Sequence, residues 1–313
     1  MNISVIIPVY NAERFLEKAV ASALQFPQVK EVLLVEDGSP DNSLEVCQNL
    51  LNKDERIKLF QHPDKQNHGA GATRNLGLQK ASQEFIAFLD ADDYYLPNRF
   101  DAEREIFKNE NIDGVFGAIG TEFLTEKGRE EFSEKFKHNK LTTVKYAAEG
   151  KDVLLGITGV KEGFGSFFHL DTLTIRSEKL RQCGLKFNDS LKLHQDRDFI
   201  VKLSHKLILK TGIIDEAVAI RGVHDDNRIT KIRQYSTAFY QNILKLYQSL
   251  YSWTLSEKDL PEEVKNHIKL RYLTFTAANK KGLSKVLYFA YQSILHPQLL
   301  RTRYRFHALK KHL

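Results

Sequence analysis

Short hydrophobic runs alternate with helical patterns along the first hundred residues. Apolar runs over 4–9, 31–35, 57–60 and 85–89 are short and rich in β-branched or bulky residues. Runs of this length predict strands, and the uncharged run at 85–89 predicts one buried on both faces. Between the runs, apolar residues at helix-face spacing predict helices over 12–24, 44–50 and 70–81. Strand–helix alternation from the first residues predicts a parallel sheet with right-handed crossovers.

The middle of the chain gives a weaker pattern, and the end is helical. Residues 121–150 are polar with little periodicity, and we expect acceptor or lid elements there. From residue 231 onward the apolar spacing is helical throughout. The other elements predicted are helices over 99–108, 199–203, 235–251, 261–279 and 283–295, a short helix ending at Gly184, and strands over 114–120, 167–176 and 217–220.

Three carboxylates follow the fourth apolar run directly. Asp90, Asp92 and Asp93 cannot continue a buried strand, because burying unpaired charge is costly. They therefore lie at its carboxyl end, where open α/β sheets bind ligands. Asp90 and Asp92 form an Asp-X-Asp motif, which offers hard oxygen ligands for Mg²⁺ or Mn²⁺ on a diphosphate. An acidic turn before a helix, with Pro97 near its first position, explains the same pattern.

Two other loops carry polar residues suited to a nucleotide. Asp37 ends the second strand and can accept a hydrogen bond from a uracil imide, although closing the turn at Gly38 is the simpler interpretation of that residue alone. Gly69 and Gly71 open the third helix, let backbone approach a phosphate, and precede the charge of Arg74. Close packing of this helix on the sheet explains the two glycines equally well.

Taken in order, four segments together resemble the nucleotide-sugar half of the family 2 glycosyltransferases with the GT-A fold. They are residues 4–11, 35–41, 69–77 and 88–93. The resemblance covers about residues 2–100 and implies an α/β, Rossmann-like, mostly parallel GT-A domain. One departure is Glu36, where the family more often has a second Asp. The implied division is a GT-A domain over 1–230, with a nucleotide-sugar half to residue 100 and an acceptor half over 101–230, and a basic helical extension over 231–313.

The resemblance assigns a donor site and a metal to these segments. Side chains of the first two segments would line the nucleoside, and those near 67–74 would approach the nucleotide or the sugar phosphate. Asp90 would face the ribose or donor sugar, and Asp92 would hold a divalent cation, Mn²⁺ or Mg²⁺, on the diphosphate. The implied donor-binding residues are Pro8, Tyr10, Asp37, Asn67, Arg74, Asp90, Ala91 and Asp92.

Two later residues complete the implied site. The family has a Glu-Asp pair whose Asp is the general base, and here Gln195-Asp196 keeps the Asp. Asp196 is thus the candidate base and Asp198 a structural residue, although capping by carboxylates at a helix start would explain one of them. A late His completes the metal shell in several GT-A enzymes. His224 is the candidate here, and a loop His bonded to its neighbours is the alternative.

The resemblance implies an inverting, metal-dependent hexosyl- or N-acetylhexosaminyltransferase. It would move a sugar from a nucleotide donor, a UDP-sugar, to a hydroxyl acceptor in cell-envelope saccharide synthesis. One alternative is a sugar-nucleotide nucleotidyltransferase, which would need a Gly-rich loop with Arg and Lys where residues 8–11 stand. The other is a non-catalytic, membrane-associated scaffold that retains the fold.

Composition and charge bear on location and partners. No apolar run approaches the ~20 residues that span a bilayer, and residues 2–9 read as a first strand and not as a signal peptide. Cys47 and Cys183 lack metal-like spacing, so free thiols in the cytoplasm are expected.

The basic residues are unevenly distributed. The fifty residues after Glu263 hold eleven of the 46 Lys and Arg and none of the 40 acidic residues, so they carry +11 and the rest −5. Basic residues mixed with Tyr304, Phe306 and Leu309 suit an anionic membrane surface, and predict peripheral association with its inner face. A solvated helical end is the alternative. Nucleic acid is the competing partner, which we do not expect on a sugar-transfer scaffold.

Overall fold

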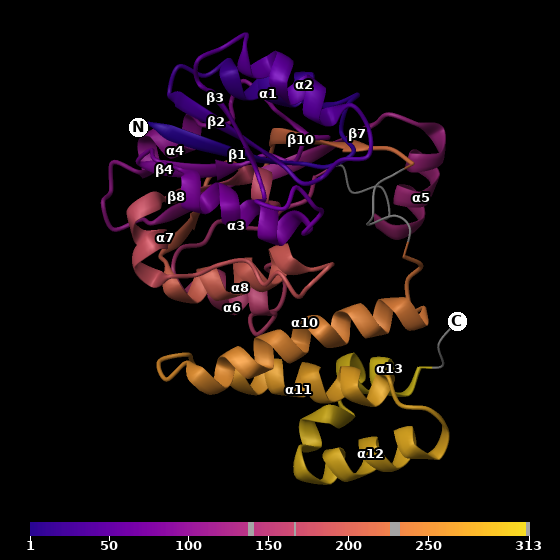
Figure 1. Cartoon of the computed structure of the whole chain (residues 1–313). Helices are drawn as coiled ribbons and strands as arrows, with labels where there is room; N and C mark the ends of the chain where they lie inside the picture. The colour runs from indigo at the N-terminus through magenta and orange to yellow at the C-terminus, as the bar shows by residue number, and fades with distance from the viewer. Residues whose placement is uncertain (137–140, 166, 226–231, 311–313) are drawn as a thin grey trace.

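The computed structural model describes residues 1–136, 141–165, 167–225 and 232–310. It shows an α/β body built on a seven-stranded sheet, with a second sheet of three strands and a layer of C-terminal helices packed below (Figure 1). None of the helices in these ranges is long and apolar enough to cross a bilayer.

The parallel half of the large sheet is the part that the apolar runs predict. Its strands are β1 (Ile3–Val9), β2 (Val29–Glu36), β3 (Ile57–Gln61) and β4 (Phe85–Phe88), joined through α1 (Leu16–Leu24), α2 (Ser43–Leu51) and α3 (Ala70–Lys80). β1 pairs in parallel with β2 and β4, and β2 with β3, which confirms the predicted parallel order. All of β4 is buried, as expected of a strand covered on both faces.

The other strands are partly antiparallel. They are β5 (Tyr94–Tyr95), β6 (Gly114–Phe116), β7 (Ala118–Phe123), β8 (Leu173–Arg176), β9 (Leu209–Thr211) and β10 (Ala217–Val223). The large sheet has the order β3-β2-β1-β4-β8-β6-β9, and the small sheet has the order β5-β10-β7. β8 is antiparallel to both of its neighbours.

The single strand predicted over 114–120 is wrong. β6 ends at Phe116 in the large sheet, and β7 begins at Ala118 in the small one. Gly117 lies at the crossing, where a Cβ atom would stand only 2.7 Å from the carbonyl oxygen of Ile213. The chain therefore changes sheet at a residue whose backbone is packed too closely to carry a side chain.

The middle helices correct one further expectation. They are α4 (Asp101–Ile106), α5 (Glu126–Phe136), α6 (Lys151–Thr158), the 3₁₀ helix η1 (Leu170–Thr172), α7 (Ser177–Cys183) and α8 (Gln195–Lys206). α5 lies within the polar stretch over 121–150, where charges on most sides hide the helical period. The strand predicted over 167–176 is reduced to β8, because η1 occupies its first half.

The C-terminal helices belong to the core of the body. They are α10 (Thr237–Ser256), α11 (Glu262–Ala278), α12 (Gly282–Leu295), the 3₁₀ helix η2 (Pro297–Leu300) and α13 (Thr302–Leu309). Tyr240, Tyr247 and Phe275 join the hydrophobic cluster that also contains Phe88 of β4. A smaller cluster links α11, α12, η2 and α13. The boundary predicted at residue 230 lies outside the described residues.

One residue of the expected membrane-facing set does not face outward. Tyr304 is 1% exposed, and its hydroxyl lies 3.1 Å from the Nδ1 atom of His267. Arg303 beside it pairs with Glu162 at 2.9 Å. Phe306 and Leu309 are 46% and 42% exposed. The expectation for Tyr304 is therefore wrong, because this side chain fills the space between α13 and α11.

Candidate active site

Polar side chains from loops far apart in sequence meet beyond the carboxyl ends of the parallel strands. The loop after β2 contacts the loop before α3, and the loop after β4 contacts both α3 and the end of β10. The start of α8 packs against the first turn of α3. This arrangement places most of the residues expected at the site along one edge of the sheet.

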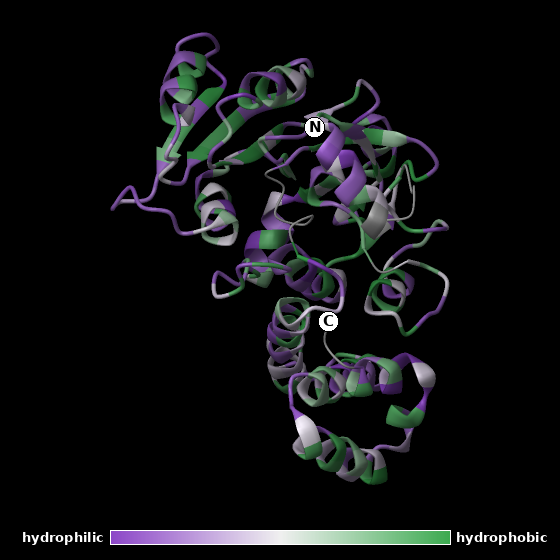
Figure 2. Ribbon diagram, turned by 90° about the vertical axis from the view of Figure 1, so that its right-hand side faces the viewer, coloured by the Kyte–Doolittle hydropathy of each residue, from purple (hydrophilic) through white to green (hydrophobic). Residues whose placement is uncertain are grey.

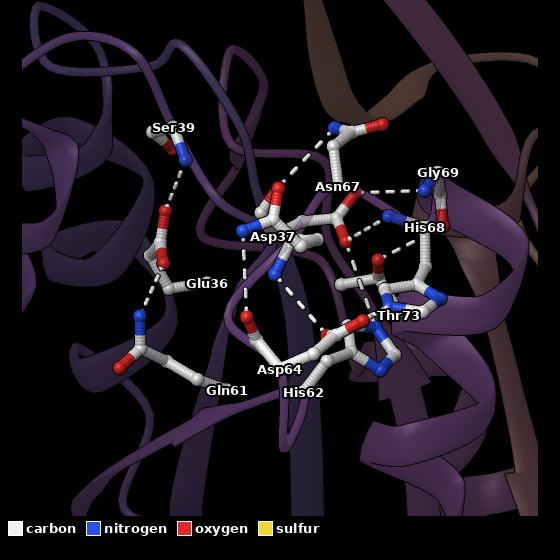
Figure 3. Close-up of polar contacts among 11 residues, drawn as sticks. Glu36, Asp37, Ser39, Gln61, His62, Asp64, Asn67, His68, Gly69 and Thr73 are labelled. Atoms are coloured by element: carbon white, nitrogen blue, oxygen red, sulfur yellow. Dashed lines mark hydrogen bonds and ion pairs between the residues drawn. The ribbon is translucent and has the colours of Figure 1, made fainter.

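Asp37 joins two of these loops. It is 2% exposed, and its two carboxylate oxygens accept hydrogen bonds from the backbone N–H groups of His68 (2.8 Å) and Gly69 (2.9 Å). The Asn67 side-chain amide donates to the Asp37 carbonyl oxygen at 3.2 Å. Figure 3 shows the Asp37 carboxylate directed at this loop, with the His62 ring nitrogen 3.5 Å away. Closing the turn is thus an observed role of Asp37, and its contact with a nucleoside stays a prediction.

Glu36, where the family more often has an Asp, also stabilises the turn that follows β2. Its two carboxylate oxygens accept from the Ser39 backbone N–H at 2.6 Å and from the Gln61 side chain at 2.7 Å (Figure 3). Gly38, which follows Asp37, has a φ of 69°, and a Cβ there would lie 2.9 Å from the Asn67 backbone nitrogen. The turn after β2 therefore requires glycine at this position.

Replacing Asp37 with Ala is expected to lower the free energy of unfolding by about 1–3 kcal/mol, because two backbone N–H groups lose their acceptors. Urea denaturation would measure this loss. Asp64→Ala is the matched control, since Asp64 is 54% exposed and bonds only at the surface of the same loop. The control should change stability by less than about 0.5 kcal/mol. Equal losses in the two variants would contradict the structural role of Asp37.

Arg74 and Asp90 form a partly buried ion pair between α3 and the loop after β4. Arg74 is 6% exposed, and its Nη2 atom donates to Oδ1 of Asp90. The Asp90 backbone N–H in turn donates to the carboxylate of Asp171 at 3.2 Å. Burial raises the pKa of Asp90, and the Arg74 charge offsets only part of that rise. The two residues that the resemblance places near the donor are thus in direct contact.

Asp92 and His224 also come together, although 132 positions separate them. Oδ2 of Asp92 and Nε2 of His224 are 3.1 Å apart, and the two side chains are 31% and 11% exposed. The contact depends on Gly222, where a Cβ atom would lie 2.4 Å from the carbonyl oxygen of Asp92. The His224 ring packs on Phe15, with centroids 4.6 Å apart. A carboxylate and an imidazole so placed fit two ligands of one divalent cation.

A second acidic group was not expected from the sequence. Ligand atoms of Asp90, Asp93 and His169 lie within 4.8 Å of one another, and Asp171 lies behind them with no exposed surface. Oδ1 of Asp93 accepts the Gly222 backbone N–H at 2.9 Å. Asp171 could have indicated this group, because it is a carboxylate inside a segment, 167–176, that otherwise reads as a buried strand. A carboxylate buried in a strand is costly unless another group bonds to it, so a partner side chain was to be expected.

The carboxyl groups of Asp93 and Asp171 titrate as a pair. Burial, followed by the charge of Asp171, raises the pKa of Asp93 well above its ordinary value. Burial also acts on Asp171, but His169 and Asp93 outweigh it and lower the Asp171 pKa to about 2. His169 Nδ1 is 3.4 Å from the Asp171 carboxylate. Of the two carboxyl groups, Asp93 therefore keeps a proton to higher pH than Asp171.

Asp196 lies at the start of α8, beside the Arg74 pair. Its Oδ1 accepts the Arg197 backbone N–H at 2.8 Å. Burial lowers the pKa of Arg74, but the charges of Asp90 and, after it, Asp196 raise it above its ordinary value. Asp198, expected to be structural, is fully buried and accepts from Lys202 at 2.6 Å. The structure thus separates the two carboxylates of this helix start into one near the site and one in the core.

Close packing of α8 on α3 sets the position of Asp196. α3 has a glycine, Gly71, at the point where α8 approaches it. A Cβ atom added to Gly71 would lie 2.1 Å from Oε1 of Gln195, so a larger residue would not fit there without movement of Gln195. His194, just before α8, has a φ of 62°, an uncommon conformation for a residue with a side chain. The Gln that departs from the Glu-Asp pattern therefore serves as a packing contact.

The remaining donor-site residues are placed at the rim. Pro8 is half-buried near the end of β1, Tyr10 just after it is 47% exposed, and Ala91 is buried between Asp90 and Asp92. The structure shows no contact that would test their predicted roles toward a nucleotide.

Sequence comparison identifies the domain. The sequence model of glycosyl transferase family 2 matches residues 4–173, more than half of the chain. An uncharacterized glycosyltransferase of Haemophilus influenzae is 44% identical over 102 residues, which are 32% of this chain and 40% of that protein. Another, of Rickettsia typhi, is 28% identical over 256 residues, 82% of this chain and 72% of that protein. The first match thus spans less than half of its relative.

Solved structures share the fold at low sequence identity. Staphylococcus aureus TarS 1–349, in complex with UDP-GlcNAc, aligns with a TM-score of 0.63 and 19% identity, over 99% of this chain and 84% of that chain. Mannosyltransferase PcManGT from Pyrobaculum calidifontis, in complex with GDP-Man and Mn²⁺, aligns with a TM-score of 0.53 and 14% identity, over 98% and 83%. These likenesses confirm the fold expected from the sequence.

Proposed function

The chain belongs to glycosyl transferase family 2, and from this premise we propose that it moves a sugar from a UDP-sugar to a hydroxyl of a saccharide acceptor. The observation that carries the proposal is the meeting of the Arg74–Asp90 pair, the Asp92–His224 pair and Asp196 at one edge of the sheet. A UDP-sugar is favoured because TarS, whose fold covers nearly the whole chain, was solved with UDP-GlcNAc.

Donor binding would use the loops that the strands present. Tyr10 is exposed at the end of β1 and offers a ring face to the base. The second lone pairs of the Asp37 oxygens remain able to accept from the base while the backbone bonds hold the carboxylate in place. Arg74 would bring its positive charge toward the sugar phosphate while holding Asp90 against the ribose or donor sugar.

For a divalent cation, Asp92 and His224 are the fitting ligands. Asp90 already binds Arg74, and Asp93 accepts the Gly222 backbone N–H of β10, so both carboxylates already serve contacts within the protein. An oxygen–nitrogen donor set suits Mn²⁺ better than Mg²⁺, which prefers oxygen alone. When bound there, the cation would neutralise charge on the leaving diphosphate.

Asp196 would accept the proton of the acceptor hydroxyl. An ordinary Asp is a weak base near neutral pH, so the proton must leave as the bond to the donor breaks. Attack by the hydroxyl on the face opposite the diphosphate gives a single displacement with inversion, and no covalent bond to the enzyme forms. We place the acceptor in cell-envelope saccharide synthesis, and the enzyme in the cytoplasm at the inner face of a membrane.

A panel of nucleotide sugars tested by thermal shift, with and without Mn²⁺, is the direct test. A ligand at 100 times its dissociation constant stabilises the fold by about 2.7 kcal/mol. We expect UDP-sugars to raise the melting temperature more than GDP- or CMP-sugars, and Mn²⁺ to increase the rise. The best ligand should then release UDP in an acceptor assay. Release of pyrophosphate would indicate a nucleotidyltransferase, and no binding by any member a scaffold without activity.

A further inference from the structure

The outer face of α12 is apolar and exposed. Six of its large hydrophobic side chains are more than half exposed, and three further exposed ones follow in η2 and α13. They are Leu283, Val286, Leu287, Tyr291, Ile294 and Leu295, with Leu300, Phe306 and Leu309. Elsewhere in the described residues, only six large hydrophobic side chains are exposed, and they are scattered. A gathering of this kind marks an interaction surface.

The face runs the whole length of the helix without a charge. Leu283, Leu287, Tyr291 and Ile294 follow one another at intervals of four, four and three residues, which places them on a single side. The buried residues of α12 are Phe289 and Ser293, on the side toward α11 and α13. Its one charged residue, Lys285, is half-buried and donates to the Lys310 carbonyl oxygen.

α12 also lies where a large surface can reach it. It is the lowest helix in Figure 1, at the end of the molecule away from the sheet, and Figure 2 shows hydrophobic residues along it. Its main contacts are with α11, η2 and α13. The described part of the α/β body therefore leaves this face uncovered.

The charges around the face favour an anionic surface as its partner. Lys281 precedes the helix, Arg301 and Arg305 follow it, and all three are exposed. No acidic residue occurs after Glu263 to balance them. In a symmetric dimer with the two α12 helices antiparallel, the basic residues at one end of the helix would face those at the other end of its copy, and like charges would repel. A bilayer with anionic lipid supplies both an apolar phase and opposite charge.

We propose that α12 docks on an anionic membrane by inserting this apolar face, with the helix lying in the plane of the interface. The basic residues at its two ends would then contact lipid headgroups. This inference rests on the proposed location of the enzyme at the inner face of a membrane. It differs from the prediction made from the sequence, because the main contact with lipid is made by the apolar residues of α12 and not by the basic residues of α13. Interfacial helices bury their apolar face to a depth of about 5–10 Å in the bilayer. The exposed side chains of α12 can reach this depth while the helix stays folded on α11 and α13.

Vesicle sedimentation tests the proposal with charge-introducing variants. With vesicles of phosphatidylglycerol and phosphatidylcholine, Leu287→Glu and Ile294→Glu should each lower the partition coefficient by about tenfold or more, since each removes an apolar side chain that would insert into the bilayer. Leu255→Glu is the matched control, because Leu255 is 73% exposed on α10, outside the face. The control should bind like the parent protein.

Three outcomes would overturn the proposal. Equal binding of the parent protein and both α12 variants would show that the face does not insert. If the parent protein bound vesicles of phosphatidylcholine alone as well as it binds the mixed vesicles, anionic lipid would have no part in docking. A parent dimer that Leu287→Glu converts to a monomer in light scattering would assign the face to a second copy of the chain. The thermal shift by UDP-sugars, measured on the same proteins, should be unchanged, so it tests the proposed reaction separately.

Discussion

Replacing Asp196 with Asn is expected to lower kcat by about 10²–10⁴-fold and to leave the affinity for the donor unchanged. Asn has nearly the same size as Asp, and its side-chain oxygen can still accept the Arg197 backbone N–H. What the substitution removes is the ability to take a proton from the acceptor hydroxyl. The helix start should therefore keep its shape while the transfer step slows.

The experiment pairs turnover with donor titration. Initial rates of UDP release at saturating donor and acceptor report kcat, and calorimetric titration of the UDP-sugar reports affinity. Asp152→Asn is the matched control, because Asp152 also lies in the first turn of a helix, α6, and is exposed outside the site. It should retain parental kcat. Near-normal turnover of Asp196→Asn would make the base assignment wrong, and a loss of donor affinity would move Asp196 to the donor site.

The parallel half of the fold was predictable because its signals are local. Each of the strands β1, β2 and β4 is a short apolar run that ends in polar or turn-forming residues. The small sheet was not predictable in this way. β5 has two residues, and the break at Gly117 depends on a carbonyl group almost a hundred positions away. Strand character there is decided by tertiary packing, which overrides the local pattern.

The site shows the same division between local and tertiary signals. The Asp-X-Asp motif and the Asp after Gln195 can be read from adjacent residues, whereas the contact of Asp92 with His224 exists only once β10 passes the loop after β4. His169 and Asp171 were missed because a strand assignment gave them no reason to turn inward together. Their partners, Asp90 and Asp93, lie about 80 positions earlier in the chain.

The tail illustrates the limit of charge as a predictor. The excess of Lys and Arg after Glu263 predicts a basic surface in this region, but charge alone does not show which side chains are exposed. Tyr304 fills the core, while the apolar face of α12 carries no charge at all and was read only as a helix. Exposure of an apolar side chain is a property of the packed structure.

Replacing Asp92 with Ala is expected to abolish the effect of Mn²⁺ on donor binding. Loss of a residue that merely orients a metal ligand already costs about 10–100-fold in affinity, so loss of the ligand itself should cost more than about 100-fold. His224→Ala should weaken Mn²⁺ binding less, because the negatively charged carboxylate remains to attract the cation. Both effects follow from the 3.1 Å contact between Asp92 and His224.

Paramagnetic resonance of Mn²⁺ measures binding without relying on activity, and titration of the UDP-sugar with and without Mn²⁺ measures the coupling. Asp101→Ala is the control, since it removes an exposed carboxylate of α4 that pairs only with Arg104. The control should bind Mn²⁺ and donor like the parent.

If Asp92→Ala retained Mn²⁺ binding while substitution of His169 removed it, the cation would belong to the group formed by Asp90, Asp93 and His169 instead. The Asp92–His224 contact would then be a hydrogen bond that holds β10 against the loop after β4.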